Sequence, residues 1–412
     1  MNESLKHLLR PFVRPVKRAL RPLLYSRRPP LCENVVVWAL DAGYPVKRIH
    51  EPFLLDLPIP IGCETDRKAA ALFDGQSHFG LPAQFLICLP RGGVPGSAGL
   101  TTMPSGEFLV ESVCRPQYLL DSPTYRSRLP VRKRWLDGDW YSLLSFFGGN
   151  YGHWFWEDLP RLFAALPHLP PSTHFLVRAP LPPFQRDSLS LLGITPDRLV
   201  PQDPPNLHTK CERLWFATPL GNQDWAVTAP DIVHQMSQSL IRGLNKPSSE
   251  GPKRIYVSRE GMTKNRRLIN EIDLLRTIQD FGFQVVRPEC LSLADQIRTF
   301  KDAEVVLGAF GAGLANMLFS RPQSMILELQ DPIFAPRPWY WKMASILGHE
   351  WRCCVGQSKS MRISNWATDW PTATFSLDEK QLAAFLESAL RTDLSTSKRQ
   401  WWNCNPLTSV IS

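Results

Sequence analysis

The chain has 412 residues, of which 43% are hydrophobic and 21% are charged. This balance is that of a globular protein; it excludes a mostly disordered or fibrous chain, and the length favours two domains. The sequence contains no run of about 18 apolar residues, so it predicts no membrane-spanning helix.

The net charge of +9 is concentrated at the N-terminus. Residues 1–30 hold eight basic residues and one acid, Glu3, and so contribute +7 of that charge. A basic tail on a nearly neutral body argues against nucleic-acid binding and for an anchor at an anionic surface. Apolar residues recur in the tail at helical spacing, but Pro11, Pro15 and Pro22 interrupt it. Two interpretations follow, an element lying on an anionic membrane or a disordered basic leader.

The cysteines do not form a recognisable framework. There are nine, an odd number, and their spacings fit no zinc or redox motif. We therefore expect reduced thiols, mostly buried, in a reducing compartment. The N-terminus also lacks the uninterrupted apolar core of a secretory signal.

Short apolar runs predict strands in the first half of the chain, at residues 35–38, 84–88, 141–147, 175–177, 199–200 and 214–216. Helices are predicted from residue 151, at 187–192 and at 232–244. Because strands and helices alternate after residue 141, this half predicts a parallel α/β layer. Residues 245–252 are rich in Pro, Ser and Gly and form the best linker in the chain.

The second half has a clearer pattern. Strands are predicted at 254–258, 283–286, 304–307 and 325–329, separated by helices at 271–281, 292–300 and about 313–319. Asn270 and Ser292 are predicted N-caps of the first two helices. This β-α-β-α-β-α-β order predicts a parallel sheet with right-handed crossovers.

Two features at the carboxyl edge of that sheet predict an anion site. Residues 308–313 form a turn with glycines in the order G-x-x-G-x-G, which is not the dinucleotide pattern and so argues against a nicotinamide dehydrogenase. Residues 253–267 form a loop with six cations and one acid, suited to phosphate. The alternatives are tight packing of the turn and a solvated charged loop. Glu328, at the same edge, either holds a ribose or pairs with a loop arginine.

The helix that begins at residue 151 carries candidate catalytic groups. His153 could deprotonate a hydroxyl, Glu157 lies one helical turn away and could orient it, and Asp158 is the carboxylate alternative. The other interpretation is a packed helix start. Asp137 and Asp139 have the Asp-x-Asp form of some metal sites, but turn chemistry explains the same pattern.

Three runs resemble the motifs of glycosyltransferase family 61, in order, over about residues 135–335. They are Asn150-Tyr151-Gly152-His153-Trp154 with Glu157 and Leu159-Pro160-Arg161; Arg254-Ile255-Tyr256-Val257-Ser258-Arg259 with Arg266-Arg267-Leu268-Ile269-Asn270-Glu271; and Gly308-Ala309-Phe310-Gly311-Ala312-Gly313-Leu314-Ala315-Asn316 with Ile326-Leu327-Glu328-Leu329.

The resemblance implies a GT-B fold, with two Rossmann-like α/β domains whose parallel sheets face across a cleft. It implies inverting, metal-independent transfer from a nucleotide sugar, commonly UDP-linked, onto a hydroxyl of a glycan or lipid-linked glycan. Such bacterial members often serve capsule or exopolysaccharide synthesis, so we expect a cytoplasmic protein at the inner membrane face. One position departs from the family: Phe310 stands where a histidine is usual, so the alternative is an inactive nucleotide- or glycan-binding homologue.

The resulting prediction has four segments: a basic leader (1–30), an acceptor-side domain (31–245), a donor domain (253–385) and a tail (386–412). His153 or Asp158 takes the acceptor proton, with Glu157 beside them. The predicted donor-binding residues are Arg259, Lys264, Arg267, Gly311, Ala312, Gly313, Asn316 and Glu328. No metal, cofactor or nucleic acid is expected.

Overall fold

The computed structural model describes residues 28–60, 71, 73–113, 116–120, 122–127, 131–203, 206–221, 227–244, 250–261, 267–333, 338–359 and 374–391. Nearly all of the basic leader, Lys264 and most of the C-terminal tail lie outside these ranges. Helix α13 (Glu379–Arg391) continues past residue 385, so the predicted domain limit there falls inside a helix.

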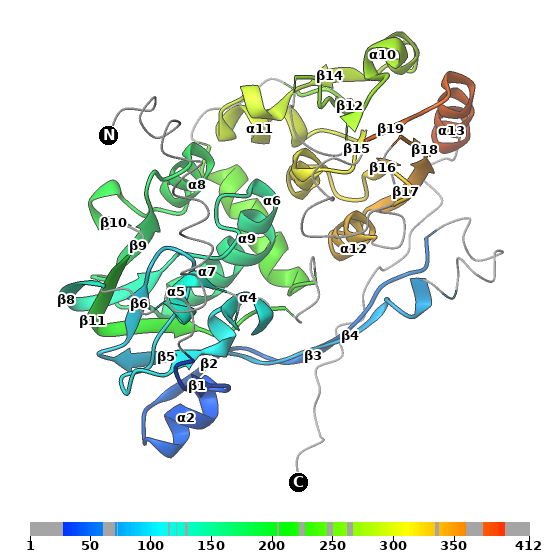
Figure 1. Cartoon of the computed structure of the whole chain (residues 1–412). Coiled ribbons are helices and arrows are strands. Elements are labelled where there is room, and N and C mark those ends of the chain that lie inside the picture. The colour runs from blue at the N-terminus through cyan, green and yellow to red at the C-terminus, as the bar shows by residue number, and fades with distance from the viewer. Residues whose placement is uncertain are drawn as a thin grey trace, which may run out of the picture.

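The N-terminal half is built on a seven-stranded mixed sheet in the order β10-β9-β8-β11-β5-β2, with β6 also paired to β11 (Figure 1). The neighbours from β10 to β11 are parallel, as predicted. Strands β5, β2 and β6 are antiparallel to their neighbours, so the expectation of a purely parallel sheet was wrong here. The strands are β2 (Val46–His50), β5 (Gln84–Pro90), β6 (Gly93–Pro95), β8 (Arg132–Ser142), β9 (His174–Arg178), β10 (Leu199–Gln202) and β11 (Leu207–Ala217).

One predicted strand of this half is a helix. Residues 35–38 belong to α2 (Val35–Asp41), because the Asn34 side chain accepts hydrogen bonds from the Val36 and Val37 backbone N–H groups at 2.9 and 3.0 Å. A cap of this kind outweighs the weak strand preference of three valines. The other helices are α4 (Pro116–Leu120), α5 (Pro123–Arg126), α6 (Tyr151–His153), α7 (Leu159–Ala165), α8 (Pro183–Leu191) and α9 (Pro230–Arg242).

The C-terminal half is built on a five-stranded, entirely parallel sheet in the order β14-β12-β15-β16-β17. Its first four strands confirm the predicted alternation, and β17 adds an edge strand that was not predicted. The chain passes from β12 to β14 on one side and from β15 to β16 on the other. A topological switch point therefore lies between β12 and β15, where α/β proteins commonly bind ligands. The strands are β12 (Arg254–Val257), β14 (Gln284–Val286), β15 (Val305–Ala309), β16 (Met325–Gln330) and β17 (Glu350–Val355).

The two predicted helix caps have different outcomes. Ser292 caps α11 (Leu293–Phe300), since its hydroxyl accepts the Asp295 N–H, as predicted. Asn270 does not cap α10 (Glu271–Asp280); its amide exchanges two hydrogen bonds with the Leu377 backbone, at 2.8 and 3.2 Å. A tertiary partner has therefore replaced the local one. The remaining helices of this half are the 3-10 helix η6 (Ala312–Phe319) and α12 (Trp339–Ile346).

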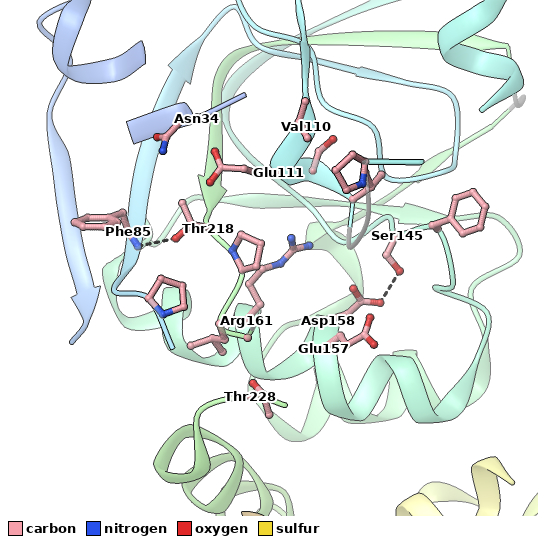
Figure 2. Close-up of a pocket in the computed structure, with 18 of the residues that line it drawn as sticks. Asn34, Phe85, Val110, Glu111, Ser145, Glu157, Asp158, Arg161, Thr218 and Thr228 are labelled. Carbon is pink, nitrogen blue, oxygen red and sulfur yellow. Dashed lines mark hydrogen bonds between the residues drawn. The ribbon is translucent and has the colours of Figure 1, made fainter. Parts of the chain in front are cut away.

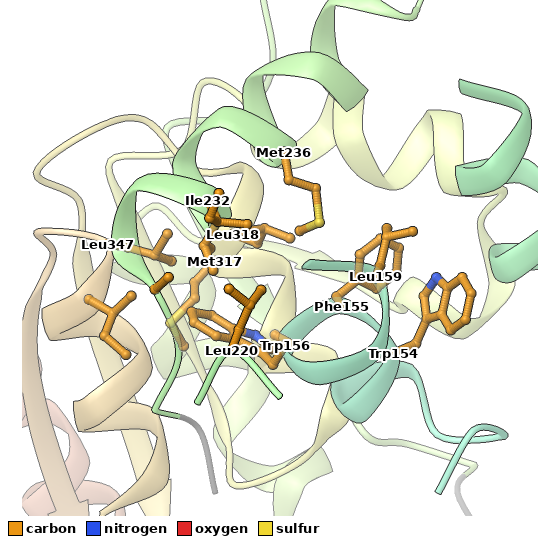
Figure 3. Packing of buried hydrophobic residues seen from close by; sticks show 14 of the residues in the cluster. Trp154, Phe155, Trp156, Leu159, Leu220, Ile232, Met236, Met317, Leu318 and Leu347 are labelled. Atoms are coloured by element: carbon orange, nitrogen blue, oxygen red, sulfur yellow. The ribbon is translucent and has the colours of Figure 1, made fainter. Parts of the chain in front are cut away.

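The two halves share one hydrophobic core rather than facing each other across an open gap at these elements. Trp154, Phe155 and Trp156 are at most 1% exposed and belong to the same buried cluster as Met317 and Leu318 (Figure 3). The Ser237 hydroxyl on α9 also donates to the Leu318 carbonyl at 2.6 Å. The GT-B arrangement is therefore not established by the fold, which is a mixed α/β structure containing parallel sheets.

An arm of the N-terminal half crosses to the other half. Strands β3 (Phe53–Asp56) and β4 (His78–Leu81) pair antiparallel and extend beneath α12 (Figure 1). The Trp341 indole N–H donates to the Pro58 carbonyl at 3.1 Å, and Phe73 packs edge-on against Trp341. The arm therefore fixes α12 against the N-terminal half.

The remaining elements are short. They are β1 (Leu31–Cys32), β7 (Phe108–Leu109), β13 (Arg267–Leu268), β18 (Gln357–Ser358), β19 (Thr374–Ser376), a π-helical turn η2 (Trp154–Asp158), and the 3-10 turns η1 (Val110–Ser112), η3 (Leu166–His168), η4 (Pro196–Arg198) and η5 (Pro288–Cys290). Within the described ranges, no helix is both long and apolar enough to cross a bilayer.

Candidate functional site

The glycine turn and the basic loop meet at the switch point of the C-terminal sheet. Arg259 follows β12, and Gly311 follows β15. A Cβ atom added to Gly311 would lie 1.7 Å from Nη1 of Arg259, so the guanidinium rests directly on the glycine backbone. A Cβ atom at Gly313 would lie 2.8 Å from Cγ1 of Val257. At both positions an added Cβ atom would collide with a neighbouring side chain, which would have to shift.

Arg259 brings a positive charge to the start of η6. The Glu271 carboxylate accepts the backbone N–H of Arg259 at 3.0 Å and so fixes the loop, while burial lowers the pKa of the guanidinium. Arginine keeps its charge at any physiological pH, even with a lowered pKa. Ala312 and Gly313, the first residues of η6, are partly exposed. A guanidinium beside a helix start whose first residues are partly exposed is a suitable place for an anion.

Other predicted donor residues lie elsewhere. Arg267 is exposed on β13, which pairs with β19 rather than with the parallel sheet. Asn316 is fully buried; it accepts a hydrogen bond from the Tyr151 hydroxyl at 2.7 Å and donates to the Gly313 carbonyl at 3.1 Å. It therefore joins the two halves of the molecule.

Glu328 is also fully buried. Its carboxylate accepts hydrogen bonds from the Trp351 indole at 2.9 Å and from Gln330 at 3.2 Å, and burial raises its pKa to about 8. The predicted arginine pairing is thus replaced by Trp351 and Gln330. Because the carboxylate is enclosed, a ribose could reach it only after these side chains move.

Phe310 points into the core rather than into the crevice. It is 1% exposed, and its ring packs against Trp339 and Tyr340 with centroids 5.5 and 5.2 Å away. Where the resemblance leads us to expect a histidine, this turn therefore has a buried phenylalanine ring. The charged side chain beside the turn is that of Arg259.

The helix of the first motif contains an irregular turn. Asn150 caps it by accepting the Gly152 N–H at 2.8 Å. The backbone N–H of Leu159 then donates to the Trp154 carbonyl, five residues back, which makes residues 154–158 a π-helical turn. Pro160 explains this turn, because it has no N–H for a regular helical bond. Such turns often occur at functional sites.

The π-helical turn forms one wall of a pocket of about 560 Å³ in the N-terminal half (Figure 2). Trp156, Glu157, Asp158 and Arg161 come from the motif helix. The other walls come from the start of α2, residues 82–85, residues 110–113 with Pro116, residues 145–147, and residues 218–221 with 227–228. The volume lies within the range of about 300–1,000 Å³ typical of small-molecule sites.

Asp158 is the most perturbed acid of this pocket. It is 6% exposed and accepts a hydrogen bond from the Ser145 hydroxyl at 2.6 Å. Burial raises the pKa of Asp158 to about 6, although the Arg161 charge and the Ser145 hydrogen bond act in the opposite direction. A carboxylate with this pKa is a better base than an ordinary aspartate and is still ionised at neutral pH.

The comparison with known families identifies this region. Residues 151–327 match the family described as Glycosyltransferase 61. No curated protein matches the chain. The match confirms the predicted resemblance and indicates a glycosyltransferase; it includes the motif helix, Arg259 and the glycine turn.

Within the matched segment, His153 and Asp158 occupy different positions. His153 Nδ1 lies 2.9 Å from the Glu157 carboxylate, so the predicted contact between these two side chains is present. The imidazole also stacks on Phe147, with ring centroids 4.4 Å apart. Glu157 and Asp158 line the pocket, and His153 is not among its lining residues.

The Asp-x-Asp sequence that precedes the family segment forms structural contacts. Asp139 accepts two hydrogen bonds from Arg213, at 2.8 and 3.1 Å, and one from Trp215 at 2.8 Å. Gly138 has a φ of 84° beside a register shift between β8 and β11, and its N–H donates to Glu212 at 2.7 Å. These residues lie inside β8 at a β-bulge, so the turn interpretation was wrong and the motif is part of a strand. In the described part of the chain, no three His, Cys, Asp or Glu side chains gather as metal ligands.

Sequence reasoning did not find several pocket residues. Arg161 was visible in the first motif but was given no role. Glu111 and Ser145 lie before the family segment and carry no local pattern, so nothing in the sequence pointed to them. Glu111 accepts the Val35 N–H at 2.6 Å, and burial raises its pKa.

Proposed function

We propose that the protein is an inverting glycosyltransferase that moves a sugar from a nucleotide-sugar donor, UDP-linked, to a hydroxyl group of a glycan or lipid-linked glycan. The observation that carries the proposal is the Arg259 guanidinium resting on Gly311 at the switch point of the parallel sheet. A positive charge at a helix start in this crevice fits a nucleoside diphosphate.

The donor diphosphate binds at Arg259 and the first N–H groups of η6, and Lys264, which lies outside the described residues, is a further candidate from the sequence. As the bond between the sugar C1 and the diphosphate oxygen breaks, negative charge grows on the leaving group. A fixed guanidinium stabilises that charge in the transition state. We therefore propose that turnover does not require a metal and persists in the presence of EDTA.

The acceptor binds in the pocket of the other half, which gives the two-site arrangement of a GT-B enzyme. Asp158, or His153 acting with Glu157, takes the proton of the acceptor hydroxyl while its oxygen attacks C1 opposite the leaving group. One C–O bond forms, the C1–O bond to the diphosphate breaks, and the configuration at C1 inverts. The pKa of about 6 favours Asp158 in this role.

The motif helix connects the two sites. Its first residue, Tyr151, donates to Asn316 on η6, and its π-helical turn lines the pocket. A single short segment thus contacts both the donor helix and the acceptor pocket, which supports their use in one reaction.

The basic leader supplies the membrane part of the proposal. With +7 in residues 1–30, it would hold the enzyme at the anionic inner face of a bacterial membrane, where capsule or exopolysaccharide precursors are assembled.

A thermal-shift measurement with UDP tests the donor site. We expect UDP to raise the melting temperature of the wild type and of the exposed control Arg391→Ala, and to leave Arg259→Ala unshifted. An equal shift in all three proteins would place the nucleotide elsewhere.

Phe310 keeps an inactive homologue as the second candidate function. That protein would show the same UDP shift but neither hydrolyse nor transfer sugar from any nucleotide sugar in a donor panel.

A further inference from the structure

We infer that the pocket of the N-terminal half selects acceptors by charge: it takes a sugar ring that is uncharged or carries an amine, and it excludes rings that carry a carboxylate. The inference rests on the proposed function, which makes this pocket the acceptor site, and it names the class of acceptor. It comes from the charged side chains around the pocket and from their partners.

Carboxylates outnumber cations in the pocket lining. Glu33, Glu111, Glu157 and Asp158 line it, and Arg161 is the single Lys or Arg among the lining residues that the structure describes. In Figure 2 Arg161 extends into the pocket with Glu111 on one side and Asp158 on the other. Four carboxylates thus face one guanidinium in the lining, so an acidic ligand would meet more repulsion than attraction.

The carboxylates have room for donors from a ligand. Glu111 accepts the Val35 N–H, Asp158 accepts the Ser145 hydroxyl, and Glu157 contacts His153. A carboxylate has about four acceptor positions, so each of these groups can accept further hydrogen bonds. Sugar hydroxyls and ammonium groups supply such donors, whereas a ligand carboxylate supplies none.

Aromatic rings complete the lining. Phe85, Phe146, Phe147 and Trp156 line the pocket, and Phe146 is 41% exposed and stacked on Tyr118. Flat apolar faces suit the C–H faces of a sugar ring, and a few polar groups then fix its orientation. Aromatic walls beside acceptor carboxylates therefore fit an uncharged or amino sugar.

Matched pairs of methyl glycosides test the inference on the full chain. Saturation-transfer NMR compares each neutral hexoside with its 2-amino form and with its 6-carboxylate form, in the gluco, galacto and manno series. We expect the carboxylate member to bind at least tenfold more weakly than its neutral partner, and the gap to narrow when salt screens the pocket. Equal or tighter binding of the carboxylate form, or binding of no neutral or amino member in any series, overturns the inference.

A variant pair assigns the discrimination to the pocket. Glu111→Gln keeps an oxygen to accept the Val35 N–H but removes one negative charge, so it should reduce the neutral-to-carboxylate ratio several-fold. Glu387→Gln removes a charge from the exposed face of α13, where Glu387 pairs with Arg391, and should leave the ratio unchanged. Equal ratios in both variants would contradict the inference. If Arg259→Ala kept the UDP-induced rise in melting temperature, the donor assignment would be refuted instead. The binding ratios of the glycosides do not depend on that result.

Discussion

The glycine turn of the C-terminal half and the pocket of the N-terminal half are built in opposite ways. The turn places one guanidinium directly against the backbone of a glycine, and both belong to the matched family segment. The pocket takes the motif helix and residues 218–221 and 227–228 from that segment, and its remaining walls from residues between Glu33 and Phe147, outside it. A shared donor chemistry can therefore be conferred by short motifs, while acceptor choice depends on dispersed residues.

The charges of the two regions are opposite as well. The turn presents a cation at a helix start, and the pocket presents several acids around a single arginine. A diphosphate would accordingly bind at the turn, because the acids of the pocket repel it. A hydroxyl-rich ring would bind in the pocket, because the carboxylates there accept its hydrogen bonds.

The largest expected effect is on turnover and comes from changing the proposed base in the pocket. Asp158→Asn should lower turnover by roughly 10²–10⁴, the usual contribution of a general base, with UDP binding unchanged. A base must be unprotonated, so the wild-type rate should rise with pH through about 6, the raised pKa of Asp158.

His153→Ala provides the matched test for the same step. If Asp158 is the base, His153→Ala should keep much more turnover than Asp158→Asn, and its pH profile should still rise near 6. The reverse order of rates would assign the base to His153. Melting temperatures of both variants must stay near that of the wild type for the rates to be compared.

A second prediction contrasts Asp158, which lines the pocket, with Glu328, which is fully enclosed. The folded-state pKa of Glu328, about 8, lies above the ordinary value of 4.5, so folding favours its protonated form. Its contribution to stability is complete below pH 4.5 and is lost as pH rises through 8; the loss should reach a few kcal/mol. Glu328→Gln should therefore lose less stability than the wild type between pH 5 and 9 in denaturant titrations. Parallel curves would show that the carboxylate is not sealed from water.

The sequence predicted the C-terminal half better than the N-terminal half for a physical reason. Strands of a parallel sheet are buried on both faces and are separated by helices, so apolar runs and helical spacing mark each one. In the N-terminal half, short apolar runs reveal strands but not their direction, and β5, β2 and β6 run antiparallel.

Local signals failed wherever a tertiary partner decided the outcome. Asn270 stands at the N-cap position of its helix, but its side chain bonds Leu377 instead of the helix. Asn34 is a different case, because its cap is a local signal that the valine run obscured. The candidate site followed the same rule: Arg259 and Gly311 stand in recognisable motifs, but Glu111 and Ser145 reach the pocket only through the fold.

A third prediction perturbs the turn without removing Arg259. Gly311→Ala places a methyl group at the position of the guanidinium, which is the free end of a flexible side chain and can move aside. The fold should survive, but the displaced cation should cost about 1.5–3 kcal/mol of UDP affinity, the contribution of a charged hydrogen bond. Gly80→Ala, on β4 with no atom within 4 Å of an added Cβ, is the control and should bind UDP normally. Equal affinities measured by calorimetry would remove Arg259 from the donor site.

The smallest effect concerns the connection between the two regions. Tyr151→Phe deletes the hydroxyl that donates to Asn316 and leaves a buried amide oxygen without that donor, so it should lower stability by about 1–2 kcal/mol. Tyr125→Phe removes a comparable buried hydroxyl, which donates to the Pro29 carbonyl within the N-terminal half. Both variants should lose similar stability in denaturant titrations. If the motif helix couples the sites, however, only Tyr151→Phe should weaken the effect of bound UDP on the affinity of a neutral glycoside, because only its hydroxyl contacts the donor helix. Equal coupling in the two variants would reduce the Tyr151–Asn316 hydrogen bond to a structural link.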